Sequence, residues 1–280
     1  MNEPFPDPRT LLKKYGLSAK KSWGQNFLVA ESVYRAITDA TVKTNEDWVV
    51  EFGGGLGTLS MRLLQRLAEG RLFIVERDRE MVAVLRDQFE QIDGVEVVEH
   101  NALTYDFATV ARWRGDPITL CGNLPYNIAS QILFRVAEHR ACVSRGVFMI
   151  QREMAERILA MPGTKAYGVM GVMLQTYVDV RMVRRTVKPT AFHPPPKVDS
   201  TVIAMTPLAG NAPRAPINDE TRYREVVRAA FAQRRKTVRN SLRSKFEPEE
   251  VDRMLDTAGV DGGRRAETLA IAEFAALSNA

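Results

Sequence analysis

A short apolar segment that runs into a glycine-rich turn constrains the fold of this chain more than any other feature. Trp48-Val49-Val50-Glu51-Phe52 has the composition of a buried strand, and Gly53-Gly54-Gly55-Leu56-Gly57 follows it directly. From Thr58 to Leu67 apolar residues return at helical spacing. Glycines let a backbone turn sharply and approach a ligand closely. Strand, turn and helix together predict a nucleotide-type loop in an α/β sheet.

The positions of the glycines narrow the class of ligand. They fall at 53, 55 and 57, whereas a dinucleotide fingerprint that starts at Gly53 requires a glycine where Thr58 stands. The Gly-Lys-Ser/Thr sequence of a triphosphate loop is also missing. The pattern therefore disfavours a nicotinamide cofactor and ATP.

An acidic residue follows the next apolar segment. The run from Arg71 to Val75 ends at Glu76, nineteen positions after Gly57. A carboxylate at the tip of the second strand of such a unit is placed to accept hydrogen bonds from both ribose hydroxyls. The alternative is an ordinary surface glutamate, but the matching strand and turn before it favour the ribose role.

Strands and helices go on alternating along the chain. Further strands are predicted at 95–99, 118–121 and 146–150, with helical patterns between them. This alternation implies a parallel, doubly wound sheet, which binds ligands at the carboxyl ends of its strands. Asn101 lies at such an end, where its side-chain oxygen is placed to accept a hydrogen bond from an adenine amine.

A polar and aromatic turn, Gly122-Asn123-Leu124-Pro125-Tyr126, follows the fourth predicted strand. An amide oxygen and a backbone carbonyl accept the hydrogens of an exocyclic amine, while an aromatic ring stacks on its base. Asn123, Leu124 and Tyr126 supply these three groups. The same residues also suit a turn that only reverses the chain. The turn alone does not decide between the two interpretations.

The chain beyond residue 150 divides into a proline-rich loop, a linker and helices. The loop 188–199 either closes a sheet edge or holds Phe192 against a substrate, and its composition leaves both open. Helices are predicted at 219–242, 248–258 and 266–277. The predicted organisation is a basic N-terminal arm with little core of its own at 1–22, a catalytic domain at 23–207, a linker at 208–216 and a helical domain at 217–280.

Positive charge is concentrated in the helical domain. The chain carries a net charge of +5, yet the segment from Arg222 to Lys245 holds nine Lys or Arg and only Glu225 as an acid, a local surplus of nine minus one, or +8. Such a segment is either a solvated helix face or a contact for an RNA phosphate backbone. The charge alone leaves both interpretations open; the family resemblance described below is what implies RNA contacts for Arg234, Arg235, Lys236 and Arg239.

Composition argues against several other classes of protein. The two cysteines form no CxxC pair and the three histidines show no metal-ligand spacing, so no metal site is expected. The first residues show neither the basic n-region nor the apolar h-region of a signal peptide, and no later apolar run reaches membrane-spanning length, so we expect neither a signal peptide nor a membrane span. We expect a cytoplasmic protein.

Six stretches in this order resemble the ribosomal RNA adenine dimethyltransferases along nearly the whole chain. The last two favour the branch that modifies small-subunit RNA over the related antibiotic-resistance enzymes of the large subunit. The stretches are Gly24-Gln25-Asn26-Phe27-Leu28, Glu51-Phe52-Gly53-Gly54-Gly55-Leu56-Gly57, Glu76, Asn123-Leu124-Pro125-Tyr126, Phe192-His193-Pro194-Pro195-Pro196-Lys197-Val198-Asp199-Ser200, and Gln233-Arg234-Arg235-Lys236-Thr237-Val238-Arg239-Asn240-Ser241-Leu242.

The resemblance implies a class I, Rossmann-like methyltransferase fold with a mostly parallel seven-stranded sheet and a small all-helical C-terminal domain. It implies S-adenosylmethionine as cofactor and two adjacent adenosines in the 3′-terminal hairpin of 16S rRNA as targets, each converted to N6,N6-dimethyladenosine. The small ribosomal subunit is the expected partner of a monomeric enzyme with no metal and no membrane contact. The implied cofactor residues are Asn26, Leu28, Gly53, Gly55, Glu76, Asn101 and Asn123, and the implied catalytic residues are Asn123, Leu124, Pro125, Tyr126 and Phe192.

Two positions depart from the family pattern. Gly54 stands where many members have proline, which we expect to loosen the turn slightly. Asn101 stands where aspartate is common, which predicts somewhat weaker cofactor binding because an amide accepts without charge assistance. The competing functions are a large-subunit resistance methyltransferase, a non-catalytic ribosome assembly factor and, more distantly, a nicotinamide oxidoreductase.

Overall fold

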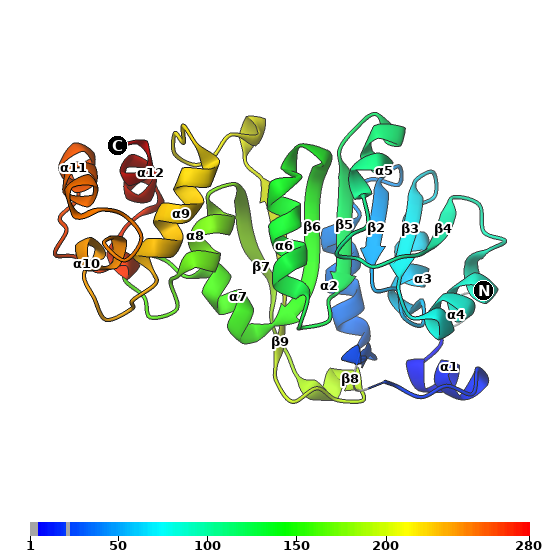
Figure 1. Cartoon of the computed structure of the whole chain (residues 1–280). Helices are drawn as coiled ribbons and strands as arrows, with labels where there is room; N and C mark the ends of the chain where they lie inside the picture. Colours follow the sequence, from blue (N-terminus) through cyan, green and yellow to red (C-terminus); the bar gives the residue numbers. More distant parts are fainter. Residues whose placement is uncertain (1–4, 21–22) are drawn as a thin grey trace. The chain divides into compact units, whose positions relative to one another are not determined.

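The computed structural model describes residues 5–20 and 23–280, so residues 1–4 and 21–22 of the predicted arm lie outside the described residues. The chain forms two compact units (Figure 1). The first comprises the chain up to residue 152 together with 181–207, and the second comprises 153–180 and 208–280. These units are groups of residues in mutual contact and do not test the domain boundaries predicted above, which stay predictions.

A seven-stranded sheet forms the first unit and confirms the predicted fold class. Its strand order is β4-β3-β2-β5-β6-β9-β7. The strands β2 to β6 pair in parallel, and β9 runs antiparallel to β6. The bounds are β2 Trp48–Phe52, β3 Arg71–Glu76, β4 Val95–Glu99, β5 Ile118–Asn123, β6 Val143–Gln151, β7 Val178–Val187 and β9 Ser200–Pro207.

Helices pack on the sheet, with α6 in front of it and α2 behind it in Figure 1. Local sequence explains where they begin and end: the Asp78 side chain accepts a hydrogen bond from the Glu80 amide at the start of α4, and Gly115 ends α5 in the left-handed conformation. The bounds are α1 Pro8–Lys14, α2 Glu31–Thr41, α3 Thr58–Leu64, α4 Arg79–Phe89, α5 Phe107–Arg114 and α6 Ala129–Glu138.

One layer of the core of this unit lies between the sheet and the helices α2, α3 and α4. Ile37, Leu63 and Leu85 are fully buried against Val49 and Ile74 of the strands. Each side chain of this size contributes about 1.5–3 kcal/mol when fully buried. This packing fixes the carboxyl ends of β2, β3 and β5, from which the conspicuous turns of the sequence extend.

The described part of the N-terminal arm packs on the sheet unit. In α1, Leu11 and Leu12 are buried and pack with Leu56, Met81 and Val84 of the sheet unit. The arm thus docks on the sheet unit through the side chains of Leu11 and Leu12, which agrees with a segment that has little core of its own. A further pair of short strands, β1 (Phe27–Leu28) and β8 (Phe192–His193), runs antiparallel.

The second unit is helical. One predicted helix, 219–242, is wrong as a single element: α9 ends at Ala230, turns follow, and α10 begins at Val238. The break arises because the Thr237 hydroxyl accepts a hydrogen bond from Asn240 while the Val238 amide donates to the Arg264 carbonyl. The bounds are α7 Arg152–Leu159, α8 Val169–Gln175, α9 Glu220–Ala230, α10 Val238–Leu242, α11 Pro248–Ala258 and α12 Ile271–Asn279.

The described part of the chain contains no helix that is both long and apolar enough to cross a membrane. Within residues 5–20 and 23–280, no group of three or more His, Cys, Asp or Glu side chains is arranged to bind a metal ion.

Both cysteines are free thiols. Short 3₁₀ helices occupy Arg140–Cys142, Pro189–Ala191, Ala209–Asn211 and Ala266–Thr268.

Candidate active site

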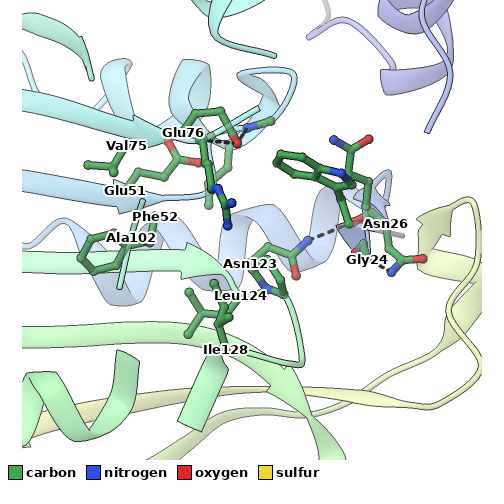
Figure 2. Close-up of a pocket in the computed structure, with 18 of the residues that line it drawn as sticks. Gly24, Asn26, Glu51, Phe52, Val75, Glu76, Ala102, Asn123, Leu124 and Ile128 are labelled. Atoms are coloured by element: carbon green, nitrogen blue, oxygen red, sulfur yellow. Dashed lines mark hydrogen bonds between the residues drawn. The ribbon is translucent and has the colours of Figure 1, made fainter. Parts of the chain in front are cut away.

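A pocket of about 460 Å³ opens at the carboxyl ends of β2, β3 and β5 (Figure 2). With the exception of Phe192, every cofactor and catalytic residue predicted above lines it. Residues from separate parts of the sequence thus converge on one cavity, which parallel strands produce because their carboxyl ends meet at one edge. The predicted residues in its wall are Asn26, Leu28, Gly53, Gly55, Glu76, Asn101, Asn123, Leu124, Pro125 and Tyr126.

Glu76 is held rigidly by backbone amides of its own surroundings. Its Oε2 accepts a hydrogen bond from Gly55 at 3.0 Å, and its Oε1 accepts from Arg77 at 2.7 Å and from Asp78 at 2.8 Å. A carboxylate has about four lone-pair directions. One direction therefore stays open, on Oε2, so a bound ribose would share that oxygen between its two hydroxyls or displace one backbone donor.

The glycine turn is built from left-handed backbone and close packing. Gly53, Gly55 and Gly57 all have positive φ angles, of 77°, 54° and 74°. Gly54 does not, but a β-carbon added there would lie 2.2 Å from Cγ2 of Ile74. Ile74 thus fills the volume that a larger residue would need at position 54. The departure from proline is matched by the packing around it, beyond any effect on the unfolded chain.

Asn101 closes a turn with its own backbone. Its Oδ1 accepts a hydrogen bond from the Leu103 amide at 3.0 Å, just beyond the end of β4. The side chain still lines the pocket. An aspartate in this conformation would spend one oxygen on Leu103 and present the second to the pocket, whereas Asn101 has an amide nitrogen in that place.

Asn123 is oriented by a segment far away in the sequence. Its Nδ2 donates to the Asn26 carbonyl at 3.1 Å, the contact drawn as a dashed line in Figure 2. Because the amide nitrogen is engaged, the side-chain oxygen is left as the free acceptor. This is the polarity that an incoming amine requires, since an amine donates hydrogens.

Leu124, Pro125 and Tyr126 complete the acceptor turn. The Leu124 amide donates to the Met149 carbonyl at 3.1 Å, and no donor of the described residues reaches the Leu124 carbonyl. The Pro125 carbonyl accepts from Ile128 and Ala129 and so joins the turn to the start of α6. Tyr126 shares a hydrogen bond of 2.8 Å with the Ser200 hydroxyl, which fixes its ring, and burial raises the pKa of its phenol.

Phe192 does not reach this pocket. Its side chain is only 4% exposed and belongs to the core of the sheet unit, and its backbone lies opposite Leu28 in the β1–β8 pair. In this conformation it has no free face to offer to a base. A stacking role for Phe192 requires the proline-rich loop to move, and that role stays a prediction.

Many other residues line the pocket that were not predicted as site residues, and Glu51, Trp23 and Arg77 are the ones among them with a distinctive environment. Glu51 is fully buried, accepts a 2.6 Å hydrogen bond from Ser60, and burial raises its pKa to about 8, an effect that Ser60 opposes and Glu76 reinforces. Its position inside an apolar strand was the available signal. Trp23 and Arg77 also line the pocket, with the guanidinium 5.5 Å from the Trp23 ring. Their contact joins residues far apart in the sequence and left no local pattern.

The predicted RNA-binding residues differ in how they are engaged. Arg234, Arg235 and Lys236 are exposed in the turns between α9 and α10. Arg234 donates a hydrogen bond to the Lys165 carbonyl. Arg239 forms an ion pair with Asp252 and is less available for a phosphate.

Comparison with known proteins identifies the family. The model of the ribosomal RNA adenine dimethylase family matches residues 16–280. The chain is 50% identical to ribosomal RNA small subunit methyltransferase A of Myxococcus xanthus, over 98% of this chain and 94% of that protein. It is 46% identical to the protein of the same name from Syntrophotalea carbinolica, over 92% and 95% of the two chains.

Solved structures show the same fold. A dimethyladenosine transferase from Plasmodium falciparum superposes with a TM-score of 0.74 at 23% identity, covering 90% of this chain and 95% of that one. The 23S rRNA methyltransferase ErmE gives a TM-score of 0.67 at 25% identity, covering 91% and 98%.

Proposed function

The chain belongs to the ribosomal RNA adenine dimethylase family, and we propose that it methylates N6 of two adjacent adenosines in the 3′-terminal hairpin of 16S rRNA to give N6,N6-dimethyladenosine. S-adenosylmethionine is the proposed cofactor, and the small ribosomal subunit is the proposed substrate particle. That substrate implies action in the cytoplasm. We propose that the enzyme acts as a monomer, since the mechanism described below uses residues of one chain only.

The observation that carries this proposal is the orientation of Asn123. Its nitrogen is held by the Asn26 carbonyl, and the Leu124 carbonyl accepts no hydrogen bond from the described residues. Both residues line the pocket, so it has two acceptors to which the described residues donate no hydrogen bond. An exocyclic amine is the group that satisfies both, because it carries two hydrogens.

The pocket also fits the proposed cofactor. Three left-handed glycines keep side chains out of the turn, and Glu76 presents its one open direction on Oε2. Gly53 and Asn26 would hold the methionine end, Glu76 the ribose and Asn101 the adenine. When bound, S-adenosylmethionine supplies a methyl group already activated by its sulfonium.

The protein's own task is to bring the amine into a reactive geometry. The lone pair of adenine N6 is delocalised into the ring, so reaction requires the nitrogen to become more tetrahedral. The Asn123 oxygen and the Leu124 carbonyl favour that geometry and stabilise the positive charge that develops on nitrogen. Tyr126 stacks on the base after it leaves its helix, which returns about 1–3 kcal/mol of the unstacking cost.

The direct test is to incubate unmethylated small subunits with labelled S-adenosylmethionine and to map the 3′-terminal hairpin by mass spectrometry. We expect dimethylation of two adjacent adenosines. Label in large-subunit RNA would instead identify an enzyme of the resistance type. Tight binding to small subunits without any label would identify a non-catalytic assembly factor.

The basic segment of the helical unit is proposed to contact phosphates without reading bases. Replacing Arg234, Arg235 and Lys236 by alanine should make the salt dependence of RNA binding shallower, because each phosphate contact releases counterions. An unchanged dependence would show that the segment is an ordinary solvated surface.

A further inference from the structure

A second cavity, of about 670 Å³, lies within the helical unit and is not explained by the methyl-transfer site. Its wall combines α7, the segment that precedes α8, and the end of α9. Every lining residue belongs to this one unit. Aromatic rings, cations and one free carboxylate meet in it.

The aromatic part of the wall is formed by rings that pack on one another. The rings of Tyr167 and Phe231 meet edge to face with centroids 6.1 Å apart, and Phe231 packs on Phe274 at 5.5 Å. Tyr167 is 2% exposed, whereas Phe231 is partly exposed at the end of α9. The cavity therefore has an aromatic surface against which a flat ring can stack.

Cations surround this surface. Arg157 and Lys165 are exposed in the cavity wall, and neither forms a side-chain hydrogen bond or ion pair with the described residues. Arg234 joins them and donates to the Lys165 carbonyl, which ties the basic segment to the cavity. Unpaired cations at the edge of an apolar hollow are suited to phosphates.

An acidic side chain completes the set. Glu153 lines the cavity and also has no partner among the described residues. A carboxylate accepts hydrogen bonds from base amines. Glu156 also lines the cavity, but the three cations Arg157, Lys165 and Arg234 outnumber the two acids and leave the wall net positive toward a phosphate. The combination of ring, cation and carboxylate therefore favours a nucleotide over a protein segment.

We propose that this cavity receives one unpaired nucleotide of the small-subunit RNA outside the target hairpin, with its base against Phe231 and its flanking phosphates on Arg157 and Lys165. The proposal rests on the function inferred above for its choice of RNA. It adds a second anchoring point, because a nucleotide inserted in a cavity fixes position more precisely than phosphate contacts on a flat surface.

The test uses the full chain labelled with ¹³C-methyl methionine and observed by NMR. Met170 lines the cavity, whereas Met161, which belongs to the same unit, is exposed and does not line it. The probe is a single-stranded RNA oligonucleotide, added without cofactor. We expect the Met170 methyl resonance to shift through the ring current of an inserted base, and the Met161 resonance to stay in place.

A double variant, Arg157→Ala with Lys165→Ala, links the shift to the cations. Its log affinity for the oligonucleotide should depend on log salt with a slope shallower by about 1.4, since each contact with single-stranded RNA contributes about 0.7. The control is Arg253→Ala, which removes an exposed arginine of α11 outside the cavity, and we expect it to leave the slope unchanged. A slope shallower by about 0.7 in this control would equal the change per cation in the double variant, and would show that the change reflects only a general loss of charge.

Three results would overturn the proposal: no shift of Met170 with RNA, an equal shift with polyglutamate, or a salt dependence unchanged in the double variant. The polyglutamate result would indicate an acidic protein segment as the occupant. Because the readout is binding without methyl transfer, it is independent of the activity test. Failure here leaves the proposed methylation standing, and absence of methylation does not remove a Met170 shift.

Discussion

The two halves of the active-site pocket are held in different ways. In the half that we propose to hold the cofactor, Glu76 accepts hydrogen bonds from the amides one and two residues after it, and Asn101 accepts from the amide of Leu103. In the acceptor half, Asn123 is oriented by a residue 97 positions away and Tyr126 by one 74 positions away. The first half is largely local, and the second is assembled by the tertiary structure.

This difference has a chemical counterpart. A cofactor is bound and released in every cycle, and a local scaffold can keep the carboxylate and amide in place between those events. An acceptor site must hold a base to within a fraction of an ångström only when it reacts. Partners from two other segments make that geometry depend on the folded domain. The following variants test whether the two halves respond as differently as their contacts indicate.

The largest effect is expected for Asn123→Ala. Loss of the free amide oxygen removes one of two acceptors for the amine, which should lower kcat by about 100- to 1000-fold. RNA affinity should change much less, because phosphate contacts supply most of it. Single-turnover rates and binding isotherms on the same RNA separate the two. Equal losses of binding and turnover would contradict the positioning role.

Glu76→Gln tests the cofactor half. The amide nitrogen of the glutamine would face backbone N–H groups that now donate hydrogen bonds to the carboxylate. The variant would also lose charge-assisted hydrogen bonds worth about 1.5–3 kcal/mol. We expect cofactor affinity to fall by about 10- to 100-fold, measured by calorimetry. The control is Glu99→Gln, since Glu99 lies beside Glu76 in the sheet but pairs with Arg79 at the surface. A similar loss in both variants would argue against a specific ribose contact.

Tyr126→Phe and Ser200→Ala address the long-range contact from both ends. Each removes the hydrogen bond between the two hydroxyls but keeps the aromatic ring, so kcat should fall by about 2- to 10-fold. The double variant should be no worse than either single one, because both remove the same bond. Additive losses in single-turnover assays would show that the two residues act separately. Tyr126→Ala should reduce kcat further, because it also removes the ring.

The smallest effect is a gain. Asn101→Asp should keep the bond to Leu103 and present a second, charged oxygen to the pocket, which predicts cofactor binding tighter by about 2- to 10-fold. Calorimetry with the apoprotein measures this. The variant Asn127→Asp adds the same charge to the pocket wall and controls for general electrostatics. Affinity equal to or below that of the unmodified protein would refute the assigned adenine contact.

Much of the scaffold could be predicted because it depends on local rules. Alternating strands and helices predicted the parallel sheet, and the helix predicted at 248–258 forms with these bounds, because Gly259 ends α11 in the left-handed conformation. The helix across 219–242 failed where a capping threonine and a distant carbonyl, that of Arg264, break it. Helical periodicity alone cannot reveal a competing partner that lies elsewhere in the chain.

The sequence by itself determined the elements that carry chemistry: the glycine turn, the carboxylate after the second strand, and an amide, carbonyl and ring after the fourth. Residue type and spacing specify these groups, and the resemblance of the motifs to the family indicates the class of substrate. Only the tertiary structure decided which groups are free. It left the Asn123 oxygen open by binding its nitrogen to Asn26, and it buried Phe192 in the core. Whether a hydrogen-bonding group or a ring face is free depends on every neighbour in space, and most of those neighbours are far away in the chain.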